Sequence, residues 1–444
     1  MTAPQLAFPI LALTVSLALT RPIVGRIRID HAPAAVLGAL LAVLVGAVPP
    51  GVAWDALGVL LRPVLTIISL MILTTVAERA QLFELVALYL AALAKGDGRR
   101  LFTWIFVAGT VTGAIFTNDA AVLIFTPLIV KLIEEVKDDS WPRSAVVPYY
   151  FAVLYVANLV GAFVISNPIN LILADIFEIS FLEYARWMIG PAVASIVVSY
   201  VGLRIFFRRD LPERFHYTRV RIPQTSRRFL ALTGAVLLLT LAGFFLGHLV
   251  GLPTWAFAVG GAAVLLTLAA LTERLDAAEI VRSIGWDVIV FVSGIFVIVS
   301  GMREAGLTAE LQRFVTYLGG AGIFSLTLVN GFVAAVCSAI MNNHPTAYTM
   351  ALAIEDMSAA AFEGLQWEVK RMLVFSALIG GDLGPKMLPI GSLAALMWFR
   401  MLRARGIEIP YALYVKVGIP VTLAAVLLSL LVLYLQYLLF GTRP

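Results

Sequence analysis

The stretch Met341-Asn342-Asn343-His344-Pro345-Thr346 interrupts an otherwise apolar segment at 320–354. Three further apolar segments contain a polar or helix-breaking interruption: Phe116-Thr117-Asn118-Asp119 in 101–135, Ser166-Asn167-Pro168-Ile169-Asn170 in 145–180, and Gly381-Asp382-Leu383-Gly384-Pro385-Lys386 in 371–400. A broken helix leaves backbone groups without partners, and hydrocarbon tolerates this only where the break lines a cavity inside the protein. Four breaks in two similar pairs are typical of a secondary transporter built from repeats.

The composition excludes a soluble protein. Of the 444 residues, 61% are hydrophobic and 13% are charged, and the mean hydropathy is +0.96. Soluble domains carry about 25% charged residues, so this chain has too little polar surface for water. The net charge of +5 comes from basic residues scattered in short loops, which indicates membrane topology and not nucleic-acid binding. Residues 6–19 follow no Lys or Arg and precede no small-residue cleavage site, so they predict a retained first helix.

Eight unbroken apolar stretches predict membrane helices, which need about 20 residues each. They lie at 6–20, 34–50, 59–77, 187–207, 229–250, 254–272, 284–301 and 411–440. Together with the interrupted segments they predict an all-α membrane protein of about ten transmembrane helices. In this prediction 101–135 and 320–354 are re-entrant hairpins, and 145–180 and 371–400 are broken helices.

Sequence matches between the two halves predict a duplication. The matching pairs are Glu78-Arg79-Ala80-Gln81-Leu82 with Arg303-Glu304-Ala305-Gly306-Leu307 at an offset of 225, Asn118-Asp119 with Asn342-Asn343 at 224, and Pro168-Ile169-Asn170 with Pro389-Ile390-Gly391 at 221. Three pairs at nearly one spacing indicate a repeated unit of about 220 residues. The predicted domains are a first repeat at 1–207, a basic cytoplasmic linker at 208–228 and a second repeat at 229–444.

The placement of the basic residues predicts the topology. If both hairpins enter and leave on the same side, 24 basic residues lie on the inner side and seven on the outer side. This bias agrees with the positive-inside tendency. Both termini then lie outside, one hairpin opens from the cytoplasm and the other from outside, and the two halves are inverted repeats.

Neutral hydrogen-bonding residues in the breaks indicate a small hydroxylated solute, because amides supply both donors and acceptors. Half-helix N-termini add partial positive charge that favours an oxygen-rich or anionic ligand. The predicted substrate-binding residues are Thr117, Asn118, Ser166, Asn167, Asn170, Asn342, Asn343, Thr346 and Ser392. The alternative is a local role, in which these groups satisfy the broken backbone and Asn343 caps the helix before Pro345.

Ionisable residues in the breaks are candidates for proton coupling, since a charge at membrane depth is functional unless it is paired. They are Asp119, Asp382, Lys386 and His344. The alternatives are that Asp119 caps the helix that begins near Ala120 and that His344 is a structural hydrogen-bonder. Asp382 and Lys386 are four residues apart and would pair on one face of a helix, but Gly384 and Pro385 predict an unwound backbone there. The two readings are a charge pair broken and remade as protons load and a permanent structural ion pair.

Motifs for other chemistry are absent from the sequence. It contains no Gly-x-x-x-x-Gly-Lys-[Ser/Thr], His-Glu-x-x-His or Cys-x-x-Cys stretch, so no catalytic residue, metal site or cofactor is predicted. Cys337, the single cysteine, lies one helical turn before Asn342. A thiol binds soft metals, but one thiolate cannot form a multi-sulfur site, and a small buried apolar role is the alternative.

The interrupted segments resemble the ArsB-type arsenite efflux permeases. The stretch 116–127 resembles the first signature of that family, 338–346 the second and 381–394 the third. The stretch 165–170, followed by 174–177, is similar to the same family, and the likeness extends over about residues 5–440. Family members often carry an apolar residue where His344 stands. The Ser-Asn-Thr signature of dicarboxylate relatives is missing, because Pro168 follows Asn167.

The resemblance implies membership of a wider ion-transporter superfamily, in which a hairpin-bearing domain moves past a fixed scaffold in an elevator-type motion. It implies export of arsenite or antimonite, as the neutral trihydroxide, across the bacterial inner membrane in exchange for protons. A soluble ATPase subunit serves some family members, and a second copy of the chain is another candidate partner. The main alternative is a sodium/proton antiporter. An intramembrane enzyme lacks a nucleophile and base here, and a passive channel is disfavoured by the duplicated breaks.

Overall fold

The computed structural model describes residues 4–24, 27–137, 141–156, 159–214, 226–273, 275–320, 322–357 and 366–440. Its only strands within these ranges are the short antiparallel pair β1 (Ile23–Val24) and β2 (Ile27–Arg28), with Ile23 opposite Arg28. Everything else with regular structure in these ranges is helical, so the predicted all-α membrane class is confirmed in its coarse form.

The helices of the first half follow the predicted apolar segments closely. In chain order they are η1 (Pro4–Leu6), α1 (Ala7–Thr20), α2 (His31–Leu44), α3 (Pro50–Val59), α4 (Leu61–Arg79), α5 (Leu82–Ala94), α6 (Gly98–Ile115), α7 (Asn118–Val136), η2 (Arg143–Val146), α8 (Val147–Val156), η3 (Val164–Ser166), α9 (Pro168–Ile176) and α10 (Phe181–Phe206). The predicted hairpin is the antiparallel pair α6 and α7, and the predicted broken helix is α8, η3 and α9.

The second half contains the same order of elements. They are α11 (Arg227–Val250), α12 (Thr254–Glu273), α13 (Ala277–Ser283), α14 (Trp286–Glu304), α15 (Leu307–Gly319), α16 (Ile323–Met341), α17 (Asn343–Glu355), α18 (Gln366–Leu383), η5 (Gly384–Lys386), η6 (Pro389–Gly391), α19 (Leu393–Arg403) and α20 (Tyr411–Phe440). Here α16 and α17 form the hairpin, and α18 to α19 form the broken helix.

Helix starts recur at a constant spacing of 225 residues. This spacing relates α4 to α14, α6 to α16, α7 to α17 and α9 to α19. It aligns Asn118 with Asn343 and Pro168 with Leu393, so the matches at offsets 224 and 221 are out of register by one and four residues. Three-residue breaks and turns shift easily in sequence, whereas a helix start is set by its cap. The inverted relation of the two halves stays a prediction.

Seven helices in the described part of the chain are long and apolar enough to cross a membrane: α4, α10, α11, α12, α14, α16 and α20. Their outer faces carry exposed apolar side chains, such as Leu238, Leu239 and Leu271, which suit contact with lipid. The helices α1 and α2 have 14 residues each, fewer than the roughly 20 that span a bilayer. The predicted count of ten spans therefore stays a prediction.

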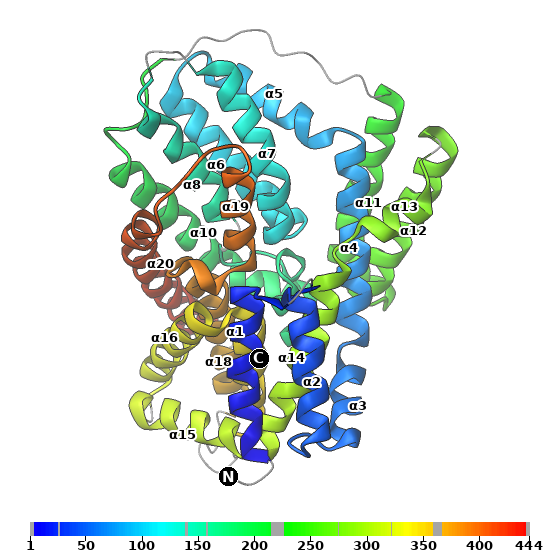
Figure 1. The fold of residues 1–444 in the computed structure, drawn as a ribbon, viewed down its shortest axis with the longest axis vertical. Coiled ribbons are helices and arrows are strands. Elements are labelled where there is room, and N and C mark those ends of the chain that lie inside the picture. The colour runs from blue at the N-terminus through cyan, green and yellow to red at the C-terminus, as the bar shows by residue number, and fades with distance from the viewer. Residues whose placement is uncertain are drawn as a thin grey trace.

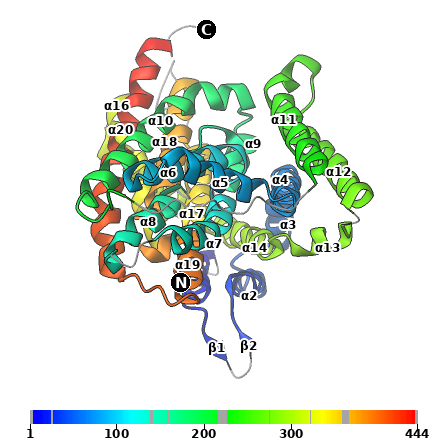
Figure 2. The same ribbon diagram turned by 90° about the horizontal axis from the view of Figure 1, so that it is seen from above.

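The two hairpins lie at opposite ends of the molecule. Figure 1 shows α5, α6 and α7 at the upper end, and α15, α16 and α18 at the lower end. Seen from above, α11 and α12 lie to one side, with α4 and α14 between them and the helices that carry the breaks (Figure 2). The helices that begin at the breaks contact each other in pairs, α17 with α9 and α7 with α19.

Glycines bring the second hairpin and the second broken helix into backbone contact. A Cβ atom added at Gly380 would lie 2.1 Å from the Gly331 carbonyl oxygen of α16, and one at Gly384 would lie 2.2 Å from the Ala335 carbonyl oxygen. Atoms cannot approach so closely, so only glycine permits this packing. The helices α16 and α18 are thereby held side by side along their length.

Candidate functional site

Each of the four breaks ends at a helix N-terminus that is capped by a side chain. In each case a side-chain oxygen accepts a hydrogen bond from a backbone N–H of the new helix. Thr117 Oγ1 accepts from Ala120 at 3.2 Å, and Asn167 Oδ1 accepts from Ile169 at 3.3 Å. Asn342 Oδ1 accepts from His344 at 3.3 Å, and Ser392 Oγ accepts from Ala395 at 3.2 Å. Short polar side chains at this position satisfy N–H groups that have no partner within the helix. The local alternative therefore holds for these four residues.

Two capping expectations are corrected. The cap of α17 is Asn342 and not Asn343, because Asn342 has a φ of 78° and its side-chain oxygen faces the His344 N–H. The cap of α7 is Thr117 and not Asp119. The side chain of Asp119 lies outside the described residues.

Asp382 joins the end of α18 to the first broken helix. Its side chain is completely buried, and its Oδ1 accepts a hydrogen bond from Asn167 Nδ2 at 2.7 Å. Its Oδ2 accepts from the Gly161 backbone N–H at 3.0 Å and from Asn170 Nδ2 at 3.3 Å. Three N–H donors compensate a carboxylate that has been removed from water. The structure therefore brings Asp382 together with Asn167 and Asn170, two predicted site residues that lie more than 200 positions before it in the sequence.

Lys386 is buried beside this centre but does not pair with Asp382. Its Nζ lies 5.0 Å from the centre of the Tyr155 ring of α8. Within the described ranges this ammonium has no hydrogen-bond acceptor and no carboxylate within 4.0 Å. This conformation therefore lacks the permanent ion pair, and the reading of a pair that is broken and remade stays a prediction. The 3-10 turn Gly384–Lys386 takes the lysine off the face of α18, so the spacing of an α-helix does not apply.

The tip of the second hairpin carries His344. Its Nδ1 lies 3.2 Å from Asn342 Oδ1, and its ring meets Phe291 of α14 edge to face, with 6.0 Å between the ring centres. Thr346 donates its hydroxyl to the Asn342 carbonyl oxygen at 2.8 Å. On the other side of Phe291 lies His31, whose Nε2 is 2.8 Å from Asp287 Oδ2. This tip therefore touches α14 through an aromatic contact.

The remaining predicted groups serve the backbone. Asn118 donates its amide to the Leu159 carbonyl oxygen at 3.2 Å, which ties the first hairpin to the first break. Ser166 donates its hydroxyl to the Phe163 carbonyl oxygen at 2.6 Å. Asn343 is buried at the start of α17. These contacts shape the site and leave little capacity for a solute.

Among the predicted site residues that the structure describes, four buried polar atoms have no hydrogen-bond partner: Asn170 Oδ1, Lys386 Nζ, Asn342 Nδ2 and His344 Nε2. An unpaired polar atom in a protein interior costs free energy and calls for an explanation. The first two lie at Asp382 and the last two lie at the second hairpin tip. The Asn342 oxygen can only accept, so the His344 proton is on Nδ1 and Nε2 of the neutral ring is an acceptor. Together the four atoms offer two acceptors and two donor groups to a ligand or to water.

Comparison with known proteins identifies the family. The profile of the family described as arsenical pump membrane protein matches residues 6–437. The chain belongs to this family. It is 33% identical over 409 residues to an arsenical pump membrane protein of Escherichia coli strain K12, an alignment that covers 90% of this chain and 92% of that protein. It is 31% identical to one of Yersinia enterocolitica, over 97% of this chain and 98% of that protein.

The fold has a counterpart among solved structures. The YdaH transporter of Alcanivorax borkumensis superposes with a TM-score of 0.59 at 16% identity, covering 100% of this chain and 99% of that one. At this identity the likeness concerns the fold alone. With the long apolar helices, it makes this arsenical pump family member a multi-pass membrane protein with a transporter fold.

Sequence reasoning missed two groups of this arsenical pump family site. Gly161 supplies a backbone N–H to Asp382, and a Cβ atom there would lie 2.4 Å from Asn170 Nδ2. A glycine just before an interrupted segment was the available signal. Tyr155 lies under Lys386 but stands in an apolar helix, where an aromatic residue is ordinary, so no local signal marks it.

Proposed function

We propose that this chain exports arsenite and antimonite from the cytoplasm, as neutral trihydroxides, in exchange for protons. The observation that carries the proposal is the buried centre at Asp382, where a carboxylate held by three N–H donors adjoins polar atoms that have no partner. Membership of the arsenical pump family supports the choice of solute.

A trihydroxide suits the unpaired atoms. Each of its hydroxyls donates one hydrogen bond and accepts others, as the hydroxyl of serine does. Asn170 Oδ1 and His344 Nε2 accept, and Lys386 Nζ and Asn342 Nδ2 donate. The solute carries no charge, so no counter-ion is required inside the protein. We therefore propose that Asn170, Lys386, Asn342 and His344 bind the substrate. The other predicted residues hold the backbone of the breaks in place or, for Asn343, lie buried beside a binding residue: Thr117, Asn118, Ser166, Asn167, Thr346, Ser392 and Asn343.

Protonation of Asp382 provides the coupling step. A carboxylate can accept all three N–H groups, whereas a carboxylic acid carries an O–H that one of these donors must vacate. The longest of the three bonds, from Asn170 at 3.3 Å, is the one expected to break. Proton binding then releases the Asn170 side chain, which turns its Oδ1 away from the solute, so protonation of Asp382 and solute binding oppose each other in this proposal. Asp119 and His344 are further proton carriers in this proposal, and Lys386 balances charge.

Movement of the hairpin-bearing helices past the remaining ones provides alternating access. The broken helices α9 and α19 are packed against hairpin arms, with α17 on α9 and α7 on α19. The helices α4 and α14 lie between this group and α11 and α12 (Figure 2). We propose that the hairpins and the broken helices carry the solute. The helices α4, α11, α12 and α14 then belong to the scaffold, past which the first group moves in an elevator-type motion.

The setting proposed for this transporter is the bacterial inner membrane, with about ten spans and both termini outside, as the distribution of basic residues favours. The linker 208–228 lies largely outside the described residues, which resume at Ser226. A soluble ATPase subunit and a second copy of the chain are the candidate partners.

Arsenite accumulation in everted membrane vesicles under an imposed proton gradient tests the function. We expect accumulation with a proton gradient and none with a sodium gradient of the same size. Asp119→Asn tests the role of the residue whose side chain is undescribed, and we expect it to abolish gradient-driven accumulation. Unchanged arsenite flux in that variant would remove Asp119 from the coupling step.

A sodium/proton antiporter is the second candidate. A buried carboxylate beside the Asn170 side-chain oxygen provides the hard oxygen ligands that small cations prefer. Vesicles with an acidic interior and a fluorescent pH dye distinguish the two candidates. Dequenching of the dye on addition of sodium, with no response to arsenite, would favour the antiporter.

A further inference from the structure

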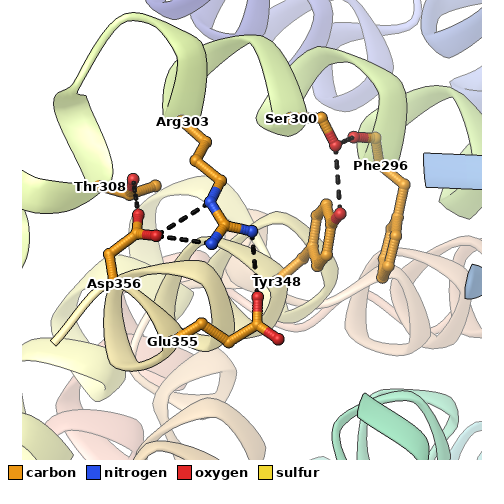
Figure 3. A network of polar contacts seen from close by, with 7 residues as sticks. All are labelled: Phe296, Ser300, Arg303, Thr308, Tyr348, Glu355 and Asp356. Atoms are coloured by element: carbon orange, nitrogen blue, oxygen red, sulfur yellow. Dashed lines mark hydrogen bonds and ion pairs between the residues drawn. The ribbon is translucent and has the colours of Figure 1, made fainter. Parts of the chain in front are cut away.

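Arg303 connects the end of α14 to the end of α17 (Figure 3). Its Nε donates to Asp356 Oδ1 at 2.9 Å, its Nη2 lies 2.6 Å from the same oxygen, and its Nη1 donates to Glu355 Oε2 at 3.1 Å. Thr308 of α15 donates its hydroxyl to Asp356 Oδ2 at 2.8 Å. The carboxylate of Asp356 is therefore oriented by a second group while it binds the guanidinium.

Further along α14, an aromatic contact accompanies these charges. Tyr348 of α17 stacks on Phe296 of α14, with ring centres 3.7 Å apart and planes 12° from parallel. The Tyr348 and Ser300 hydroxyls lie 3.1 Å apart (Figure 3). These contacts join the second hairpin to α14, a helix of the proposed scaffold.

The positions related by the 225-residue spacing carry the opposite charges. Arg303 corresponds to Glu78 at the end of α4, and Asp356 corresponds to Lys131 in α7. Both Glu78 and Lys131 are exposed, and within the described ranges neither takes part in an ion pair. The neighbouring Arg79 instead binds Glu279 of α13 at 2.8 Å.

In a transporter built from inverted repeats, the opposite state results when the two halves exchange their arrangements around the fixed site. The contact between α14 and α17 then becomes a contact between α4 and α7. We propose that Arg303–Asp356 and Glu78–Lys131 are two alternating latches, one for each state. This inference rests on the proposed alternating access.

The two latches are unequal. Arg303 holds two carboxylates and Thr308 assists, whereas the positions related to Glu355 and Thr308 are Val130 and Phe83, which offer no polar group. The Glu78–Lys131 latch is therefore a single exposed pair, and the Arg303 latch is the stronger one. The state shown by the structure is the one favoured in the absence of a gradient.

Water reaches the Arg303 latch, so it can open. A cavity of about 870 Å³ lies between α3 and α4 on one side and α14 and α17 on the other, and Arg303, Tyr348 and Glu355 line it. The side chains of Arg303 and Asp356 are 41% and 20% exposed. Ion pairs in such contact with water contribute little free energy each, which suits a contact that must break in every cycle.

Disulfide crosslinking in membrane vesicles tests the alternation. Cys337 is the only native cysteine, so the full chain with Cys337→Ser, Glu78→Cys and Lys131→Cys reports only the approach of α4 and α7. Adding Arg303→Ala, or separately Asp356→Asn, should raise the crosslinked fraction about fivefold, as expected for loss of one partly exposed ion pair. The control Arg313→Ala removes a pair with Glu310 within α15 and should leave the fraction unchanged. An unchanged fraction in both latch variants would overturn the inference.

Charge reversal tests the charges themselves. Glu78→Lys places two lysines opposite each other and should slow transport about fivefold, and Glu78→Lys with Lys131→Glu should restore it. Equal rates in the single variant and the wild type would refute the latch. The crosslinking yield does not depend on the solute. Failure of the wild type to accumulate arsenite would therefore contradict the proposed function while leaving the latch testable.

Discussion

The two broken helices occupy related positions but contribute different chemistry. The first supplies neutral groups, namely the Gly161 N–H and the amides of Asn167 and Asn170. The second supplies both charges, Asp382 and Lys386. Of two elements related by the 225-residue spacing, one carries the charges and the other supplies hydrogen bonds to it. Two buried carboxylates facing each other would repel, so under the proposed coupling a single buried carboxylate lets one proton set the charge of the centre.

The largest effect is expected from Asp382→Asn. Its amide must direct an N–H group at one of three donors, which costs about 1–3 kcal/mol for each unmatched contact, and it cannot carry a proton. We expect gradient-driven arsenite accumulation in everted vesicles to fall by at least about tenfold. Asp276→Asn is the control, because an asparagine caps α13 as well as an aspartate does. Full accumulation in Asp382→Asn would exclude Asp382 from the proposed coupling step.

A methyl group at the glycine of each break should act differently in the two copies. At Gly384 it meets the Ala335 carbonyl oxygen of the backbone, so Gly384→Ala should lower stability by about 3 kcal/mol or more. At Gly161 it lies closest to the side-chain atoms of Ser166 and Asn170, so Gly161→Ala should fold but transport poorly. Thermal unfolding in detergent separates the two outcomes.

The matched control for this pair is Gly234→Ala in α11. An added Cβ atom there has no atom within 4 Å, so the variant should be as stable as the wild type or up to about 1 kcal/mol more stable. If Gly384→Ala unfolds at the same temperature as this control, the close contact between α16 and α18 is not present in the folded protein.

Asn167 and Asn170 should separate stability from solute binding. Asn167 uses both ends of its amide, as a donor to Asp382 and as the cap of α9, so Asn167→Ala should cost about 2–4 kcal/mol of stability. Asn170 makes one long hydrogen bond and has an unpaired side-chain oxygen. Asn170→Ala should therefore cost about 1 kcal/mol of stability but weaken arsenite binding more than Asn167→Ala does. Unfolding temperatures and the arsenite concentration for half-maximal uptake give the two rankings. The same ranking in both measurements would contradict the proposed division.

The smallest effect is expected at Tyr155. Without its ring, the Lys386 ammonium would move towards Asp382 and favour the carboxylate, so protonation would need a lower pH. Tyr155→Leu should therefore shift the pH dependence of uptake about half to one pH unit towards acid. Tyr155→Phe keeps the ring and should leave the pH dependence of uptake unchanged. Neither variant alters Tyr184 or Tyr414, the other tyrosines near Asp382 and Pro385. Equal pH profiles for the two variants would exclude a role for the ring.

Long apolar runs made most of the helices predictable. Each of the eight unbroken stretches coincides with a helix, and each of the four breaks lies where a helix begins anew. The reason is that hydrocarbon imposes both the length of a span and the rarity of an interruption. The identities of Asn167, Asn170 and Asp382 as neighbours were likewise anticipated, since polar groups in different breaks must share one interior.

Contacts between distant positions could not be predicted. The bond from Gly161 to Asp382 joins residues 221 positions apart, and the glycine alone does not indicate which residue its N–H contacts. The end of the α-helix before Lys386 was predictable from Gly384 and Pro385, but the place of the lysine over the Tyr155 ring was not. Four of the predicted binding residues proved to be caps, because the residue types that bind a hydroxylated solute also begin helices.

The glycine contacts of Gly380 and Gly384 have a mechanical consequence. Because the backbone of α18 rests directly on that of α16, there is no layer of flexible side chains between them to absorb a displacement. A displacement of α16 should therefore move α18, and Asp382 with it. We expect a small-molecule inhibitor to bind more readily between α14 and α17 than between α16 and α18, because backbone contact leaves no space between the latter two helices.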